Sequence, residues 1–225
     1  MVILESVKTK LGNKIELFGE QGSDNILVIG VVHGDEPQGK YLIDKYLKNC
    51  VPNSSSNHST NNLLFIPCLN PDGMSANKRV NSNGVDLNRN FPTKNWGRNE
   101  GENATCDDCS TNYYGGTSPA SEIETGFVID IIEKYSPKLI LTLHAPYKVV
   151  NYDGPAQDIA KKISDIIGYP TESNIGYPTP GSFGTYCGIE RKISTITLEL
   201  DEKIPVENLF QPVCKIFEML SSLDL

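Results

Sequence analysis

The chain has 225 residues, of which 38% are hydrophobic and 21% are charged, values that are ordinary for a globular protein. Its net charge of −8 argues against nucleic-acid binding, because phosphates require a surface rich in lysine and arginine. The apolar run over residues 26–32 is far too short to cross a bilayer, and the first residues lack the apolar core of a signal peptide. We therefore expect a soluble, cytoplasmic protein without a membrane or nucleic-acid partner, folded as one domain over residues 1–225.

Short apolar runs alternate with helical patterns along the chain, which predicts an α/β fold. Apolar residues at helical spacing predict helices, and short apolar runs bounded by turn residues predict strands. In chain order these are strands at 14–18 and 25–32, a helix at 37–47, a strand at 63–68, a helix ending near residue 135, a strand at 139–143, a helix at 156–167, a strand at 193–200 and a helix at 206–220.

The helix that ends near residue 135 has a definite predicted start. Ser118 fits the N-cap and Pro119 fits the first turn, while Glu122 and Glu124 lie near the positive end of the helix dipole. We interpret both acids as structural, capping the helix and compensating its dipole. Before this helix, residues 74–117 show little periodicity and contain many Gly, Asn and Arg residues. A segment this long without regular structure predicts a functional loop.

Two of the chain's three histidines, His33 and His144, each follow directly after an apolar run that predicts a strand. Glu36 lies three residues after His33, so one helical turn would bring its carboxylate back toward the imidazole. Ligands at the carboxyl ends of separate strands meet at the same edge of an α/β sheet. Two imidazoles and a carboxylate are typical ligands of catalytic zinc, which indicates such a site here. The alternative is a buried, hydrogen-bonded His33 beside an acid at a helix N-terminus.

Two further segments carry candidate functional residues. Residues 84–92 contain few large apolar side chains, so this segment does not serve mainly to fill a core. Within it, Arg89 offers a planar fork suited to a carboxylate and Asn88 offers a second polar group; the alternative is a surface turn with a solvated arginine. Glu199 is the one acid in the strand predicted at 193–200, which favours burial against the sheet over a solvent-exposed strand end.

Taken in this order, the motifs resemble those of the zinc metallocarboxypeptidases, and the resemblance covers nearly the whole chain. The matching motifs are His33-x-x-Glu36, Asn70-Pro71-Asp72-Gly73, Arg79, Asp86-x-Asn88-Arg89, Ser121-Glu122-x-Glu124, His144 and Thr197-x-Glu199. The resemblance implies a mixed parallel and antiparallel twisted sheet with helices on both faces.

The resemblance also implies how the site works. His33, Glu36 and His144 would hold one zinc ion per chain, and zinc acidifies water and polarises a scissile carbonyl. Glu199 would act as the general base, which takes a proton from the water and returns it to the leaving amine. Asp86 would orient His33 and fix its tautomer.

The same comparison implies residues that hold the substrate. Arg79 would stabilise the tetrahedral oxyanion, with Lys78 and Arg98 as alternatives in the same long loop. Asn88 and Arg89 would bind the free carboxylate beside the scissile bond, which would make the protein an exopeptidase.

Two features relate less directly to the family pattern. Tyr177 precedes Glu199 at about the separation of a family tyrosine that closes over the substrate. The pair Cys106-x-x-Cys109 departs from the pattern. Half of a metal site and a redox pair are alternatives for it, but a structural zinc site needs four ligands and the sequence has no second Cys-x-x-Cys, so we favour a reduced pair or incidental loop thiols.

Within the family, residues 85–92, 143–146, 152–156 and 176–184 are most similar to those of the bacterial murein tripeptide amidases. Those enzymes hydrolyse the γ-D-glutamyl–meso-diaminopimelate bond of a cell-wall tripeptide during peptidoglycan recycling in the cytoplasm. We therefore expect this activity on a small peptide substrate. Two alternatives remain: a carboxypeptidase of ordinary peptides or deacylase of N-acyl amino acids, and a non-catalytic module that binds cell-wall peptides. The candidates for binding the diaminopimelate side chain are Asp153, Thr185, Glu190 and Arg191, and the sequence does not choose among them.

Overall fold

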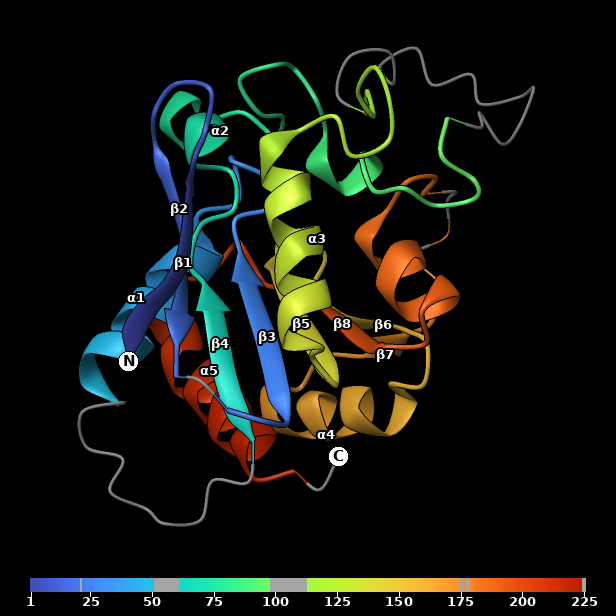
Figure 1. Ribbon diagram of the computed structural model, residues 1–225. Coiled ribbons are helices and arrows are strands. Elements are labelled where there is room, and N and C mark those ends of the chain that lie inside the picture. The colour runs from blue at the N-terminus through green and yellow to red at the C-terminus, as the bar shows by residue number, and fades with distance from the viewer. Residues whose placement is uncertain (21, 51–60, 98–112, 175, 177–178, 224–225) are drawn as a thin grey trace.

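The computed structural model describes residues 1–20, 22–50, 61–97, 113–174, 176 and 179–223. These residues contain an eight-stranded sheet of order β1-β2-β4-β3-β5-β8-β6-β7 (Figure 1). Its strands are β1 (Val2–Lys8), β2 (Lys14–Gly19), β3 (Asn25–Gly30), β4 (Asn62–Ile66), β5 (Leu139–His144), β6 (Val149–Asp153), β7 (Thr171–Glu172) and β8 (Ser194–Glu199).

The centre of the sheet is parallel and its margins are mostly antiparallel. Strands β4, β3, β5 and β8 run parallel to one another, whereas β1 with β2, β2 with β4, and β6 with β8 pair in antiparallel fashion. Because parallel strands point the same way, their carboxyl ends lie along one edge of the sheet. His33 follows β3 at this edge, His144 ends β5 and Glu199 ends β8.

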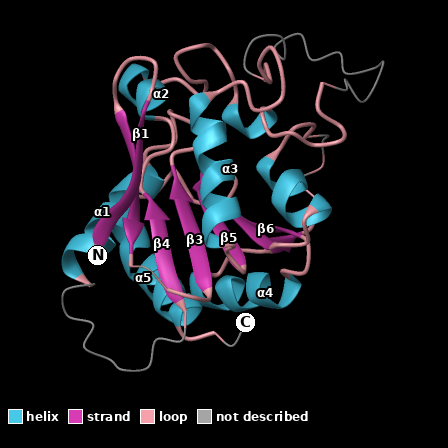
Figure 2. Ribbon diagram, viewed as in Figure 1, coloured by secondary structure: helices cyan, strands magenta, loops and turns pink. Residues whose placement is uncertain are grey.

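Helices cover both faces of the sheet (Figure 2). In β3, Ile26 and Val28 pack into the core beneath α1, α4 and α5, whereas Leu27 and Ile29 pack into the core beneath α3. This alternation follows from the two-residue period of a strand that is buried on both sides. The helices are α1 (Gln38–Asn49), α2 (Pro71–Ala76), η2 (Leu87–Arg89), α3 (Ile123–Tyr135), α4 (Gln157–Ile167), η3 (Thr185–Glu190) and α5 (Val206–Ser221). The predicted α/β class, with a mixed sheet and helices on both faces, is confirmed.

Some predicted boundaries are wrong for identifiable reasons. The strand predicted at 25–32 ends at Gly30, because Val31 adopts a left-handed backbone conformation with φ of 53°. The apolar pattern does not register this change, since Val31 and Val32 are buried like the strand before them. Strand β1 was not predicted, because its apolar run covers only Val2, Ile3 and Leu4 and the strand is largely exposed at the sheet edge.

The helix predicted to begin at Ser118 begins instead at Ile123, with Glu122 at the N-cap position. Ala120 has a φ of 53°, so residues 118–122 form a turn rather than a first helical turn. The carboxylate of Glu122 makes no capping hydrogen bond, so the capping interpretation of this acid is wrong. Glu124 does lie in the first turn of α3, as the dipole argument expected.

No helix among the residues described here combines the length and the apolar character that a membrane crossing requires.

Two glycines give a matched test of the packing of α1 and α3. A Cβ atom on Gly30 would lie 2.6 Å from the carbonyl oxygen of Pro67 and 2.9 Å from the backbone of Gly39, so Gly30→Ala forces backbone to move. We expect it to lower the free energy of unfolding by about 1–3 kcal/mol. Gly126, within α3, has open space at its Cβ position, so Gly126→Ala should raise that free energy by about 0.5–1 kcal/mol. Urea denaturation measures both, and effects of the same sign would contradict the packing described.

Candidate active site

A tight turn after β3 brings Glu36 back against His33. The amide of Asn70 donates to the carbonyl of Val31 (2.9 Å), which holds the chain where it leaves the strand. The amide of Glu36 then donates to the carbonyl of His33 (3.2 Å) and closes the turn. As a result, Nδ1 of His33 lies 2.8 Å from Oε1 of Glu36.

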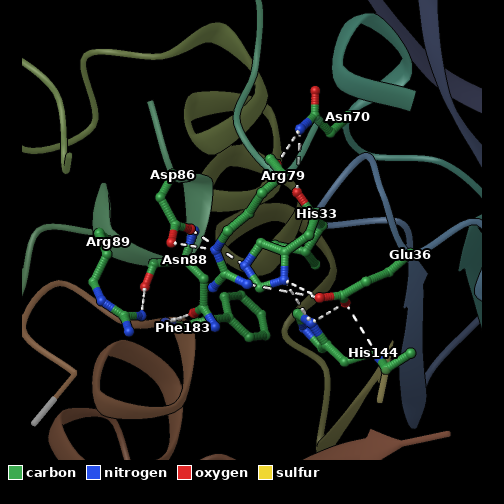
Figure 3. A network of polar contacts seen from close by, with 11 residues as sticks. His33, Glu36, Asn70, Arg79, Asp86, Asn88, Arg89, His144 and Phe183 are labelled. Atoms are coloured by element: carbon green, nitrogen blue, oxygen red, sulfur yellow. Dashed lines mark hydrogen bonds and ion pairs between the residues drawn. The ribbon is translucent and has the colours of Figure 1, made fainter. Parts of the chain in front are cut away.

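His144 reaches the same point from β5, the neighbouring strand (Figure 3). Its Nδ1 lies 2.9 Å from Oε2 of Glu36 and 3.2 Å from Nδ1 of His33. The amide of Ala145 also donates to Oε2 of Glu36 (3.3 Å), which fixes the carboxylate. We call His33, Glu36 and His144 the ligand cluster; all three side chains are buried, and their ligand atoms lie within 4.8 Å of one another.

The electrostatics of the ligand cluster favour a cation at its centre. Burial lowers the pKa of His33, but the carboxylates of Glu36 and Asp86 outweigh burial and raise this pKa to about 9. Burial likewise raises the pKa of Glu36, and the two imidazoles outweigh it, so the net pKa lies well below its usual range. Two imidazole nitrogens and a carboxylate are a donor set that zinc prefers. The residues present therefore fit a zinc ion.

Asp86 connects the ligand cluster to the loop that follows α2. Its Oδ1 lies 3.3 Å from Nε2 of His33, and its Oδ2 accepts a hydrogen bond from Nε of Arg79 (3.0 Å). Oδ1 also accepts from the amide of Asn88 (2.9 Å). Asp86 is fully buried, which raises its pKa, but His33 and Arg79 outweigh burial and hold the pKa well below its usual range. A charged Asp86 thus fixes the orientation of both His33 and Arg79.

Asn88 and Arg89 lie on η2, beside the segment that leads into η3. The side-chain oxygen of Asn88 accepts from the amide of Phe183 (2.8 Å), which leaves its NH₂ group as the available donor. Nη1 of Arg89 donates to the carbonyl of Asn88 (2.7 Å). Asn88 and Arg89 line a cavity of about 490 Å³ together with Arg79 and the ligand cluster.

Glu199 lines the same cavity at the end of β8. It is the register partner of His144 in β5, so the two side chains come from adjacent strand ends. Among the described residues its buried Oε2 has no hydrogen-bond partner. Burial raises the pKa of Glu199, with Glu36 adding to this effect and His144 opposing it. A carboxylate with a raised pKa and a free oxygen is suited to accept a proton.

Glu122 anchors the loop instead of capping α3. Its Oε2 accepts hydrogen bonds from the side-chain amides of Asn81 (2.8 Å) and Asn83 (2.7 Å). Asn81 in turn accepts from the amide of Val85 (3.1 Å), directly before Asp86. The buried acid therefore holds the turn from which Asp86 reaches the ligand cluster.

The sequence analysis missed Tyr113, which also lines the cavity. The guanidinium carbons of Arg79 and Arg89 lie 5.2 Å and 5.3 Å from the centre of its ring. The ring of Tyr113 therefore lies at cation–π distance from both arginines. An aromatic residue in a segment without periodicity gives no sequence signal for this contact. Three residues considered above, Tyr177, Cys106 and Cys109, lie outside the described residues, as does Arg98.

Comparison with known proteins shows the family of this chain. The family model described as zinc carboxypeptidase matches residues 6–203. This chain belongs to the zinc carboxypeptidase family. It is therefore a metallopeptidase, and the family implies that its metal is zinc.

Relatives and solved structures narrow the comparison. Murein peptide amidase A of Escherichia coli K12 is 31% identical over 178 residues, covering 77% of this chain and 69% of the relative. Murein peptide amidase A of Vibrio campbellii is 33% identical over 203 residues, covering 86% of this chain and 77% of the relative. The crystal structure of murein-tripeptide amidase from Escherichia coli O157 has a TM-score of 0.80 at 25% identity, covering 97% and 90% of the two chains. Carboxypeptidase A of Helicoverpa armigera shares the fold, with a TM-score of 0.72 at 16% identity over 98% of this chain and 69% of that one.

Zinc should stabilise the folded protein through the ligand cluster. Adding zinc to the chelator-treated protein should raise its melting temperature, because an ion at about a thousand times its Kd adds about 4 kcal/mol to the free energy of unfolding. His144→Ala should abolish this rise, since it removes one of the three clustered donors. Differential scanning calorimetry gives the shift, and His58→Ala, which changes the third histidine, is the matched control. An unchanged zinc response in His144→Ala would exclude this cluster as the zinc site.

Tyr113 should matter through its contact with the two arginines. Tyr113→Ala removes both cation–π contacts and should lower kcat/KM by about 3- to 30-fold, which corresponds to about 0.7–2 kcal/mol. Tyr113→Phe keeps the ring and should retain most activity. The neighbouring exposed Tyr114 is the control, because Tyr114→Ala keeps the backbone carbonyl that accepts from the amide of Asp86. Equal activity of all three variants in a steady-state assay would remove Tyr113 from the site.

Proposed function

We propose that this metallopeptidase hydrolyses the γ-D-glutamyl–meso-diaminopimelate bond of murein tripeptide. The observation that carries the proposal is one cavity that joins the ligand cluster, the carboxylate of Glu199 with its unpartnered Oε2, and the donors of Asn88 and Arg89. A site with carboxylate-binding donors beside a hydrolytic centre suits a substrate whose terminal carboxylate lies next to the scissile bond. The names of the relatives, murein peptide amidase and murein-tripeptide amidase, support the choice of substrate.

The metal requirement follows from the ligand cluster. We propose that His33, Glu36 and His144 hold one zinc ion per chain, with Nδ1 of each histidine as the nitrogen donor. When bound, zinc supplies Lewis acidity that polarises a carbonyl and lowers the pKa of water. Asp86, at 3.3 Å from Nε2 of His33, would keep the proton on that nitrogen and leave Nδ1 free to bind.

Glu199 would move the proton in this reaction. Its raised pKa makes this carboxylate a stronger base than a solvent-exposed carboxylate. The reason is that burial disfavours the negative charge, and protonation removes that charge. The same group can then return the proton to the leaving amine, as microscopic reversibility allows. The free Oε2 is the atom that would carry the proton.

Arg79, Asn88 and Arg89 would bind and orient the substrate. Arg79 is held by Asp86 through Nε, so its terminal nitrogens can donate to charge that develops on the scissile carbonyl oxygen. The NH₂ group of Asn88 and the guanidinium of Arg89 would bind the terminal carboxylate. Tyr177 closing over the substrate remains part of the proposal from the family resemblance.

We place this activity in cytoplasmic recycling of cell-wall peptides. The four cysteines that the structure describes (Cys50, Cys68, Cys187 and Cys214) are free thiols, which is typical of a reducing compartment. A tripeptide that has been released from the wall is small enough for the 490 Å³ cavity to enclose its terminal residue.

A cleavage assay with zinc-loaded protein tests the proposal. The tripeptide L-Ala-γ-D-Glu-meso-diaminopimelate should release diaminopimelate, whereas ordinary α-linked peptides should release little of their C-terminal residue. Glu199→Gln should bind zinc as the wild type does and lower kcat by about 100- to 10,000-fold, because it removes the proton acceptor. Chromatography of the products and metal analysis of the same samples provide the two readouts.

Glu133→Gln, which changes an exposed acid of α3, is the control for that substitution. Equal rates on γ-linked and α-linked substrates would replace the proposal with a general carboxypeptidase. Full activity of Glu199→Gln would refute the proton transfer. Zinc and peptide binding without any turnover would indicate the non-catalytic module instead.

A further inference from the structure

Strand β6 forms one wall of the active-site cavity. It pairs with β8 so that Val149 lies opposite Glu199, Asn151 opposite Thr197, and Asp153 opposite Thr195. Opposed residues of paired strands project to the same face, and so do alternate residues along each strand. Asn151 and Asp153 therefore share a face with Glu199, and all three line the cavity.

Asp153 is the acid of this wall that has no partner. Its carboxylate is half-buried, and among the described residues it makes no hydrogen bond and no ion pair. Burial alone raises its pKa to about 6, with no neighbouring cation to oppose the effect. By contrast, Glu36, Asp86 and Glu122 each accept hydrogen bonds from neighbouring groups. A buried acid without a partner that faces a cavity is suited to bind a cationic group of a ligand.

The chain around Asp153 is built to admit its carboxylate. A Cβ atom on Gly184 would lie 2.1 Å from Oδ2 of Asp153, and one on Gly188 would lie 2.4 Å from its Cβ. Two glycines at the ends of the same turn therefore let η3 pack directly on this side chain. Gly184 also follows Phe183, whose amide donates to Asn88 (2.8 Å). Asp153 thus lies against the segment that positions a proposed carboxylate-binding residue.

The other three candidates for binding a substrate side chain, Thr185, Glu190 and Arg191, already contact other groups of the protein. The amide of Lys94 donates to Glu190 (2.8 Å), and the hydroxyl of Ser182 donates to that of Thr185 (2.9 Å). Arg191 stacks on the ring of Tyr186 at 3.4 Å. None of these three candidates lines the cavity in the described part of the chain, whereas Asp153 does.

We propose that Asp153 is a specificity-determining residue that binds the side-chain ammonium group of the substrate's C-terminal residue. The inference rests on the proposed function in one respect, because it takes Asn88 and Arg89 as the site of the terminal carboxylate. With that end fixed, the side chain of the same residue extends along β6 past Asn151 to Asp153. The substrate class then includes peptides that end in diaminopimelate or lysine and disfavours those that end in an aliphatic residue of the same length.

The test uses two tripeptides that differ only in that ammonium group, L-Ala-γ-D-Glu-L-Lys and L-Ala-γ-D-Glu-L-norleucine. At pH 8, where the carboxyl of Asp153 is ionised, the wild type should favour the lysine peptide by about 10- to 100-fold in kcat/KM. Asp153→Asn should reduce this ratio to below about 3 while its activity on the norleucine peptide stays near that of the wild type. That retained activity shows that the variant is folded.

Asp158→Asn, an exposed acid in the first turn of α4, is the matched control and should keep the wild-type ratio. Calorimetric binding of free lysine and free norleucine to the zinc-loaded protein gives a second readout that needs no bond cleavage. Tighter binding of lysine, lost in Asp153→Asn, supports the proposal. Equal treatment of lysine and norleucine by the wild type, or an unchanged preference in Asp153→Asn, overturns it.

Failure of the proposed function gives a different result. If the protein cleaves no γ-linked tripeptide, the γ-glutamyl assignment fails, and benzoyl-glycyl dipeptide analogues ending in lysine or norleucine take the place of the tripeptides. The lysine preference and its loss in Asp153→Asn would still support the role of Asp153 in that case. The experiments therefore test the γ-glutamyl cleavage and the role of Asp153 separately.

Discussion

The structure depends on the close approach of two imidazoles and three carboxylates at the base of the active-site cavity. Nδ1 of His33 and Nδ1 of His144 lie 3.2 Å apart, with Glu36 between them and Asp86 behind His33. Positive charge at its centre would stabilise this group, since isolated carboxylates are costly to bury. Glu199 at the adjacent strand end adds a further acid. The fold around this point can be understood as the set of contacts that hold these charges in place.

Neutral side-chain amides make many of the hydrogen bonds that hold these charged groups in place. Asn70 holds the chain after β3, Asn81 and Asn83 attach the loop to Glu122, and Asn88 attaches it to Phe183. An amide both donates and accepts without adding charge, so it can satisfy a buried loop without disturbing the electrostatics of nearby acids. This explains why a segment rich in asparagine, with few apolar side chains, can be held rigidly beside the cavity.

The ligand cluster could be predicted from the sequence because its positions depend on a simple rule. Apolar runs mark β3 and β5, and parallel strands bring their carboxyl ends together, so His33 and His144 follow directly. The anchoring role of Glu122 could not be predicted, because its partners lie about 40 residues earlier in a loop without periodicity. Asp153 could be named as a candidate but not chosen, since only the register of β6 on β8 places it on the wall of the cavity.

The burial of β3 and β5 has a consequence for how the molecule fluctuates. Every residue of both strands is buried, and they occupy the middle of the sheet between two apolar cores. Amides in such strands exchange with solvent only when the whole domain opens, whereas loops open at a much smaller cost in free energy. His144 ends β5 and His33 follows three residues after β3, so both histidines lie next to strands whose amides exchange slowly, whereas Tyr113 is exposed and lies outside the helices and strands. Local opening around Tyr113 therefore costs less free energy than any motion that would separate the two histidines.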